Sequence, residues 1–317
     1  KSLETLHGCA VKFSETVKAM SGGKFEVSVH AAGELVPAFG IVDALADDSL
    51  EMGETASYYY TGKHPAFAFG CAVPFGFTAQ QMQAWKRHGN GRKLMDELYD
   101  KYNFFGLSAL STGTQMGGWY RKEMKTPADF KGLKMRLGGG VFGESMAKLG
   151  VVAQNMPVGE VYQALEKGTL DAVEFVGPYD DEKLGFNKVA KYYYYPGWWE
   201  GGPALHYFVN TAKYNELPAD YKAALHAGCQ DGNTWMMAKY DAQNPAALRK
   251  LVAGGTQLRP FPKAVMDACY AAAMERYAEE SAKNPKWKKI YDNYVAFQKE
   301  QILWFRVCEN TYDNYMA

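Results

Sequence analysis

The stretch LKMRLGGGVFGESMAKLGVVAQNMPVGEVYQALEKGTLDAVEFV, residues 133–176, decides the fold. Three apolar, strand-like runs alternate in it with two helical segments, near 142–149 and 158–168. Such a β-α-β-α-β series favours a parallel sheet with helices on its faces. We therefore expect an α/β protein.

Upstream of this stretch, helix and strand patterns also alternate. Residues 10–20 have helical spacing, 24–30 alternate like a half-buried strand, a helix is expected near 79–101, and 104–110 is a buried-strand candidate. Beyond about residue 213 the sequence is mostly helical. The 317 residues suit two lobes of about 150 residues each.

We therefore expect two α/β lobes with a cleft between them. Residues 1–112 and 202–241 would form lobe I, and residues 113–201 and 242–283 would form lobe II. Residues 284–317 would form a long C-terminal helix, which either serves a dimer or packs in the core of the monomer.

Composition excludes some classes of function. The chain has 35 Lys plus Arg and 35 Asp plus Glu, and this balance argues against a nucleic-acid partner, which calls for a concentrated basic surface. Aromatic residues make up 15%, which suits both a large core and an aromatic-walled cleft for a small molecule.

Cysteine usage and the chain ends leave the compartment open. The five isolated cysteines lack the spacing of a zinc or redox motif, so we expect buried thiols, with one disulfide left open. No apolar run is long enough to span a bilayer, about 20 residues. The opening KSLETLHG is not a signal peptide, which is compatible with an exported protein whose signal has been removed.

Several familiar motifs do not carry the function. Residues 138–143 fit GxGxxG, but no acidic residue follows where a dinucleotide ribose would need one, so we expect a turn beside a ligand or the facing lobe. His206 lies in an apolar run and is interpreted as a core or cleft-edge histidine. Asp180 and Asp181 lie in a turn before a helix, where helix capping is the simplest role.

Three charged residues occupy unusual settings. Arg136 and Glu174 interrupt apolar strand patterns near their ends, and Glu200 follows the aromatic run YYYYPGWW. A guanidinium there could grip a carboxylate through two parallel hydrogen bonds, although a solvated strand end would also explain Arg136. An inward carboxylate is costly unless it is paired or bound to a metal.

In these segments the chain resembles the substrate-binding proteins of TRAP (tripartite ATP-independent periplasmic) transporters, and most of all the branch that binds 2-oxo and 2-hydroxy acids with a metal ion. The resemblance covers most of the chain, and it implies a two-lobe fold like that of periplasmic binding proteins. It is carried by AAGELVPAF (31–39), EMGETASYYYTGKHPAFAF (51–69), FKGLKMRLGG (130–139) and VYQALEKGTLDAVEFVGPYDDEKLGFNKVAKYYYYPGWWEGG (161–202).

The resemblance implies roles for single residues. Arg136 would grip the ligand carboxylate. The cation would be bound by Gln115, by the Glu174 carboxylate, by the backbone carbonyl of Phe175 and by Glu200. Relatives often have Trp where this chain has Phe175, which keeps a carbonyl ligand but loses an indole contact. From lobe I, Tyr59 or Tyr60 would reach the ligand.

Charge counting supports a divalent ion. One arginine, two glutamates and a monocarboxylate ligand sum to −2, which a divalent cation neutralises and sodium only halves. At about 4 Å, two unit charges interact by roughly 4 kcal/mol at an effective dielectric of 20, so the imbalance matters. Oxygen ligands also suit a hard ion, and we expect calcium ahead of sodium.

The implied function is that of an exported, periplasmic solute-binding protein, not an enzyme. It would close on a small 2-oxo or 2-hydroxy monocarboxylate with its metal ion and deliver the ligand to the TRAP membrane permease subunits. The alternative, a metal-dependent lyase or hydrolase acting on small 2-oxo acids, needs a general base that the sequence does not offer beyond the proposed ligands. Relatives can form homodimers through the C-terminal helix.

Overall fold

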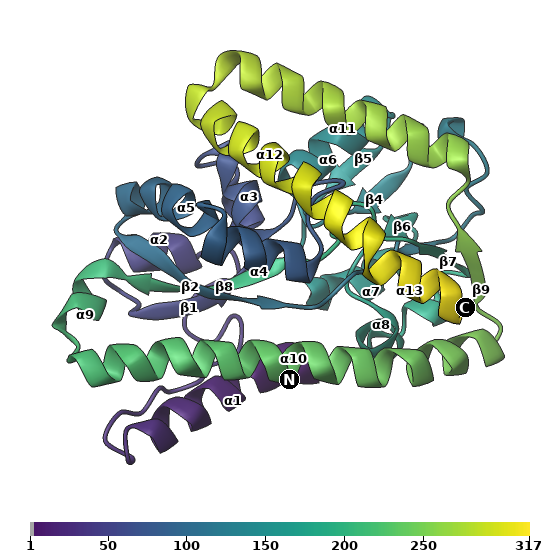
Figure 1. The fold of residues 1–317 in the computed structure, drawn as a ribbon. Coiled ribbons are helices and arrows are strands. Elements are labelled where there is room, and N and C mark those ends of the chain that lie inside the picture. The colour runs from purple at the N-terminus through teal and green to yellow at the C-terminus, as the bar shows by residue number, and fades with distance from the viewer. Residues whose placement is uncertain (1–2) are drawn as a thin grey trace.

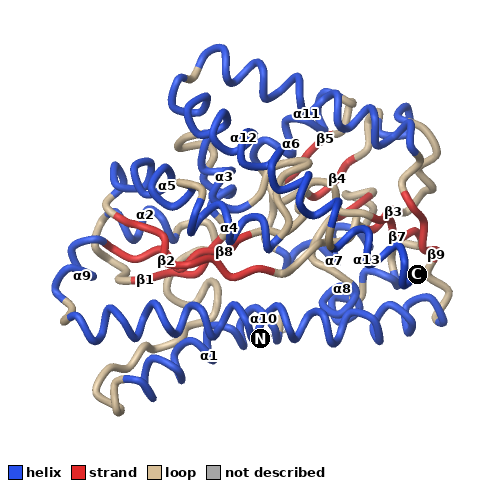
Figure 2. The backbone as a smooth tube through the Cα atoms, viewed as in Figure 1, coloured by secondary structure: helices blue, strands red, loops and turns tan. Residues whose placement is uncertain are grey.

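Two β-sheets organise the molecule, and the computed structural model describes residues 3–317, with the side chains of residues 108 and 109 excepted. The first sheet is antiparallel with the order β1-β8-β2: β1 (Met52–Thr55), β8 (Ala204–Asn210) and β2 (Phe104–Ser111). The second has the order β5-β4-β6-β3-β7-β9: β5 (Val152–Gln154), β4 (Lys134–Arg136), β6 (Ala172–Val173), β3 (Trp119–Tyr120), β7 (Tyr192–Tyr195) and β9 (Gln257–Pro260). Figure 2 shows these strands as two separate groups, which gives the molecule its two lobes.

The expected β-α-β-α-β unit is confirmed in the second sheet. Strand β4 runs parallel to both β5 and β6 and lies between them. Helix α6 (Gly140–Lys148) connects β4 to β5, and α7 (Val158–Glu166) connects β5 to β6. Arg136 pairs in register with Gln154 on one side and Val173 on the other. It therefore lies at the carboxyl end of an inner strand, where open α/β sheets bind ligands.

Helices cover both lobes. Helix α10 (Ala219–Ala253) runs beneath the two sheets, and α1 (Glu4–Met20) packs along its first half (Figure 1). Phe13 and Val17 of α1 share a core with Leu107, Tyr207 and other residues of the first sheet. The other helices before the end of α10 are α2 (Ile41–Ala46), α3 (Ala68–Cys71), α4 (Ala79–His88), α5 (Gly91–Tyr99), α8 (Pro178–Leu184) and α9 (Thr211–Glu216). The short 3-10 turns are η1 (Ser57–Tyr60), η2 (Pro65–Phe67), η3 (Asp100–Tyr102), η4 (Pro127–Phe130) and η5 (Phe186–Lys188).

The predicted strand at 24–30 is wrong. This segment is extended but belongs to neither sheet. Phe25 stacks on Tyr221 of α10, with ring centroids 4.7 Å apart, and the Val27 carbonyl accepts a hydrogen bond from the Ser14 hydroxyl. Alternating burial therefore comes from packing against helices, which a period of two does not distinguish from packing in a sheet.

Two predicted helices are interrupted. The helix expected near 79–101 breaks between α4 and α5, where Asn90 has the left-handed conformation (φ 68°). The C-terminal helix is α12 (Pro285–Val307) followed by α13 (Glu309–Met316), with the break at Cys308. Helix α11 (Lys263–Lys283) precedes them, and α12 crosses the front of the molecule from one lobe toward the other (Figure 1).

The two halves of α12 differ in their surroundings. Trp287 and Tyr294 in the first half are buried in the lobe I core, beside Phe69 and Trp85. In the second half, Trp304 is 60% exposed. The alternative of a core role in the monomer therefore holds for the first half only.

Two further findings concern the helices and the cysteines. No helix in residues 3–317 combines the length and apolarity needed to cross a membrane. All five cysteines are free, and four of them are buried: Cys9, Cys71, Cys229 and Cys269. The expectation of buried thiols is thus confirmed for these four.

Candidate functional site

The strand ends of β4 and β6 bring Arg136 and Glu174 together. The Arg136 Nη1 donates to Glu174 Oε1 at 2.6 Å and to the Glu174 backbone carbonyl at 2.9 Å. Arg136 is 3% exposed and Glu174 is 2% exposed, so the ion pair is almost completely withdrawn from water. The solvated alternative for Arg136 is therefore excluded, and two buried charges neutralise each other at this point.

Gln115 and Glu200 come from two of the connections that link the sheets, β2 to β3 and β7 to β8. The Gln115 N–H donates to the Glu200 carbonyl at 3.3 Å, and the Gly197 N–H donates to the Gln115 carbonyl at 2.9 Å. These backbone bonds hold the connections side by side. The Glu200 carboxylate is 2% exposed, and Glu174 and Arg136 both act on its charge.

Two buried side-chain oxygens of this pair lack a hydrogen-bond partner among the residues that the structure describes. They are Oε1 of Gln115 and Oε2 of Glu200. An orphaned buried acceptor costs about 1–3 kcal/mol, and more if it is charged. Because both atoms are hard oxygen donors, they suit a cation of the calcium or sodium type.

Burial also disfavours the charged forms of both carboxyl groups. It raises the pKa of Glu200 well above its usual range, and the nearby charge of Glu174 raises it further, while a hydrogen bond from Tyr58 and the charge of Arg136 oppose the rise. Burial raises the pKa of Glu174 as well, against the attraction of Arg136. Glu200 is therefore the acid in this site that most needs a positive partner.

Of the three consecutive tyrosines in η1, two face the site. The pKa of Tyr59 is raised mainly by burial, and it responds to the charges of Arg136, Glu174 and Glu200. Tyr58 hydrogen-bonds to Glu200, and sequence reasoning missed it because no strand alternation orders this segment. A 3-10 turn spreads successive side chains around its axis.

Tyr60 points elsewhere. Its hydroxyl lies 3.1 Å from the Thr55 hydroxyl, and its ring is buried in the lobe I core. The structure thus brings Tyr59 to Arg136, Glu174 and Glu200 but leaves Tyr60 apart from them.

Phe175 lies beside the arginine. Its ring centroid is 5.7 Å from Arg136 Cζ, and the ring also packs edge-on against Phe186. The side chain therefore covers one side of the guanidinium. A cation ligand from its carbonyl stays a prediction.

The glycine run after Arg136 leaves room for the side chain of Tyr58 from lobe I. A Cβ on Gly138 would lie 3.1 Å from the Tyr58 ring, and a Cβ on Gly140 would lie 2.9 Å from Thr61. The Gly138 N–H also donates to the Glu174 carboxylate. The GxGxxG-like sequence is therefore a close approach between lobes, as expected, and not a nucleotide fingerprint.

Aromatic rings surround the segment that carries Glu200. Trp199 stacks on Phe142 at 4.6 Å between centroids, and Trp198 stacks on Phe75 of lobe I at 5.0 Å. Both indoles are nearly fully buried. The YYYYPGWW run thus supplies an apolar surrounding in which charges are poorly screened.

Asp180 and Asp181 are not simple helix caps. They lie in the first turn of α8 but are buried. Asp181 accepts hydrogen bonds from the Trp119 indole at 3.0 Å and the Tyr193 hydroxyl at 2.7 Å, and Asp180 accepts one from the Tyr240 hydroxyl at 2.6 Å. They tie α8 to the second sheet and to α10.

Clusters of three or more His, Cys, Asp or Glu residues that could hold a metal ion are absent from the described residues. The predicted set contains only two carboxylates and completes its ligands with an amide and a carbonyl. The absence of such a cluster therefore does not test the predicted cation site.

Two α/β lobes with a buried arginine and carboxylates at their junction define the class of two-lobe solute-binding proteins. Residues 1–284 match the model of bacterial extracellular solute-binding protein, family 7. The chain belongs to this family, which contains the solute-binding proteins of TRAP transporters. It is thus a binding protein and not an enzyme.

Relatives agree with this assignment. The chain is 45% identical to the monocarboxylate 2-oxoacid-binding periplasmic protein of Nostoc sp. (strain PCC 7120), over all of this chain and 86% of that one. A TRAP solute-binding protein from Bordetella bronchiseptica RB50, a mixed-occupancy dimer with calcium and picolinate, is 48% identical with a TM-score of 0.97, covering 100% of this chain and 94% of that one. One from Pseudoalteromonas atlantica T6c, with sodium and pyruvate, is 37% identical with a TM-score of 0.93, covering 96% and 93%.

The contact between Gly138 and Tyr58 predicts a cost for one added methyl group. In the Gly138→Ala variant, overpacking of about 1 kcal/mol should weaken carboxylate binding about fivefold, because Tyr58 must shift for the lobes to meet. Isothermal titration calorimetry measures the change. In the control, Gly159→Ala, the added Cβ meets nothing within 4 Å, and affinity should stay the same. Equal affinities in both variants would rule out a tight contact in the bound form.

Proposed function

We propose that this protein captures a small 2-oxo or 2-hydroxy monocarboxylate together with a metal ion and delivers it to a TRAP permease. The observation that supports this most is the pair of orphaned oxygens, on Gln115 and Glu200, beside the buried Arg136–Glu174 ion pair. Arg136, which can bind an anion, and two oxygen atoms that could bind a cation thus lie together in one buried site.

Each residue has a distinct part in this proposal. Arg136 would share its N–H donors between Glu174 and the ligand carboxylate. Gln115, Glu174, Glu200 and the Phe175 carbonyl would hold the cation, and Tyr58 and Tyr59 would cover the ligand from lobe I. A bound cation would supply positive charge, and the carboxylate of the ligand and its neighbouring oxygen would chelate it.

The chemistry of the relatives' ligands narrows the class. Pyruvate and picolinate both have a donor atom on the carbon next to the carboxylate, an oxygen in one and a ring nitrogen in the other. Both can form a five-membered chelate ring with a cation. We infer that this chain selects the chelating pair of donors first and the side chain second.

Calcium is proposed ahead of sodium. After Arg136 neutralises Glu174, Glu200 and the ligand together carry −2, and only a divalent ion balances them. The relatives contain calcium in one case and sodium in another, so a hard oxygen-binding ion is common to both.

We also propose a compartment and the boundaries of the two lobes. The Nostoc relative is named a periplasmic protein, and we propose the periplasm for this chain. Lobe I would comprise residues 1–112 and 202–241, and lobe II residues 113–201 and 242–283. The sheet composition supports this division, with α10 running beneath both sheets.

Calorimetry of pyruvate binding, with calcium and with a chelator, tests the function. Arg136→Met should weaken binding by more than about thirtyfold, because a buried charge-assisted contact is worth 2–5 kcal/mol. Glu200→Gln should remove most of the calcium dependence. The control Lys134→Met changes an exposed charge on the same strand and should bind normally. Binding that survives in Arg136→Met, or that ignores the chelator in the unchanged protein, would contradict the proposal.

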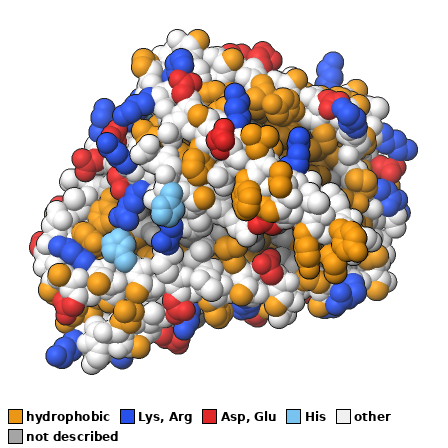
Figure 3. Space-filling model, in the orientation of Figure 1, with side chains coloured by type: hydrophobic (Ala, Val, Ile, Leu, Met, Phe, Trp, Pro, Cys, Tyr) orange, Lys and Arg blue, Asp and Glu red, His pale blue; other side chains and the backbone are white. Residues whose placement is uncertain are grey.

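A homodimer through the C-terminal helices is proposed as well. The end of α12 and α13 carry exposed hydrophobic residues: Ile302, Leu303, Trp304, Val307, Tyr312, Tyr315 and Met316. Figure 3 shows hydrophobic side chains on the surface over this part of the molecule. Contiguous patches of this kind often mark protein contacts. The Bordetella relative is described as a dimer.

Sedimentation velocity tests the dimer. The double variant Trp304→Glu, Val307→Glu places two charges in the patch and should sediment as a monomer, while Lys299→Glu, on the same helix, should sediment like the unchanged protein. If the unchanged protein is already a monomer at about 50 µM, well above the dissociation constant of a stable dimer, the proposal fails.

A further inference from the structure

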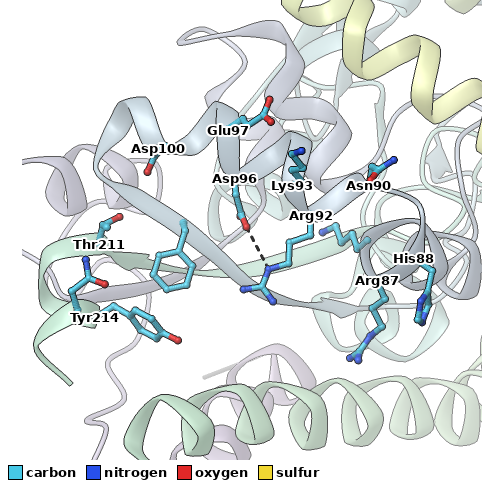
Figure 4. A pocket seen from close by; sticks show the side chains of 13 residues that line it. Arg87, His88, Asn90, Arg92, Lys93, Asp96, Glu97, Asp100, Thr211 and Tyr214 are labelled. Carbon is cyan, nitrogen blue, oxygen red and sulfur yellow. Dashed lines mark hydrogen bonds and ion pairs between the residues drawn. The ribbon is translucent and has the colours of Figure 1, made fainter. Parts of the chain in front are cut away.

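Two adjoining cavities lie over α4 and α5, away from the Arg136 site. Their volumes are about 840 and 340 Å³, and both are lined by Lys86, Arg87, His88, Arg92 and Asp96. Figure 4 shows the larger one, with Arg87 and Arg92 on the side facing α10 and Glu97 pointing the opposite way. On the surface, basic side chains and histidines gather in this region (Figure 3).

A lysine and a buried histidine form part of the wall of the smaller cavity. Lys86 Nζ donates to the Gly70 carbonyl at 2.9 Å and lies 2.8 Å from His206 Nε2. His206 is 3% exposed, and burial together with the charge of Lys86 lowers its pKa well below the usual range. A neutral imidazole accepts here, so two of the three ammonium donors are used and one is left for the cavity.

The charges around the smaller cavity do not balance. Lys86, Arg87 and Arg92 are cationic, and Asp96 is its one carboxylate, paired with Arg92 at 3.4 Å. Arg87 hydrogen-bonds to the neutral amides of Gln83 and Gln230. With Lys86 protonated the wall carries +2, and neither Lys86 nor Arg87 has an ion-pair partner in the described part of the chain.

We propose that this cavity is a second anion site, which binds a dianionic oxyanion of sulfate or phosphate size through Lys86, Arg87 and Arg92. Two guanidinium groups and an ammonium offer charged hydrogen-bond donors, which is the kind of group that binds oxyanions. The charge of −2 equals the excess on the wall. This site shares no residue with the carboxylate site, so it stands or fails independently of the proposed function.

Binding should depend on pH through the lysine. Burial lowers the pKa of Lys86 to about 7, although the charges of Cys71 and Asp96 act in the opposite direction. An anion favours the charged amine, so affinity is full at low pH and is lost as pH rises through that value. Between pH 6 and pH 8 the protonated fraction, and with it the affinity, falls about tenfold.

The other titratable groups around Lys86 do not account for this pH dependence of the anion affinity. Burial raises the pKa of the Cys71 thiol on α3 well above its usual value, and His206 on β8 stays neutral. Asp96 on α5 has a raised pKa, also from burial, and is paired with Arg92. His88 lines the same cavity, so the pH series is repeated in His88→Gln.

The experiment is a sulfate titration by calorimetry at constant ionic strength, with calcium and excess pyruvate present to fill the other site. Sulfate is chosen because it remains dianionic from pH 6 to pH 8. Lys86→Met should weaken sulfate binding at least tenfold, and Arg87→Gln, an exposed position, severalfold. The control Lys93→Met removes one positive charge from α5, at a position outside the smaller cavity, and this variant should bind sulfate normally. Cooperative thermal unfolding close to that of the unchanged protein shows that all three variants fold, and pyruvate binding should be unchanged in them.

Several outcomes would overturn the proposal. These are unchanged sulfate affinity in both Lys86→Met and Arg87→Gln, competition between sulfate and pyruvate, and an affinity that is equal at pH 6 and pH 8. If the pH dependence of sulfate binding disappeared in His88→Gln, its cause would be His88 and not Lys86. Acetate that binds as tightly as sulfate would contradict selection for a dianion.

Discussion

The carboxylate of Glu200 is the constraint on which the rest of the site depends. Three charged groups are buried together, and the one positive charge, that of Arg136, balances the charge of Glu174. Glu200 is left with an unpartnered oxygen in aromatic surroundings that do not screen its charge. Such a group either stays protonated or acquires a cation, and the orphaned oxygen of Gln115 makes the second course available. A carboxylate ligand can then bind opposite Arg136 without leaving the site strongly negative.

The fold supplies these groups from two kinds of place. Parallel strands β4 and β6 end at the same edge of their sheet, which fixes Arg136 against Glu174. Gln115 and Glu200 lie instead on the connections between the lobes, joined by backbone hydrogen bonds. In the proposed function, ligand and cation would bind where the lobes are linked, and Tyr58 meets Gly138 across the same junction. Binding there would favour one arrangement of the lobes, which a permease could recognise.

Much of this could be read from the sequence, for physical reasons that differ between residues. Charges inside apolar strand patterns mark Arg136 and Glu174, because such positions are too costly without a purpose. Gln115 and the Phe175 carbonyl came from family resemblance alone, since an amide in a loop carries no such signal. Tyr58 and the Lys86–His206 contact could not be predicted, because the first depends on a 3-10 turn and the second joins residues 120 positions apart. The strand expected at 24–30 failed because packing against α1 and α10 imitates the period of a sheet.

Calcium binding measured together with proton release tests the central claim most directly. With saturating pyruvate, titrations in buffers of different ionisation enthalpy count the protons that leave when the ion binds. Because burial raises the pKa of both Glu200 and Glu174, we expect calcium binding to release protons and calcium affinity to fall as pH falls. Both effects should be smaller in Glu200→Gln, where only Glu174 still titrates. Calcium binding that neither releases protons nor changes with pH would contradict the central claim.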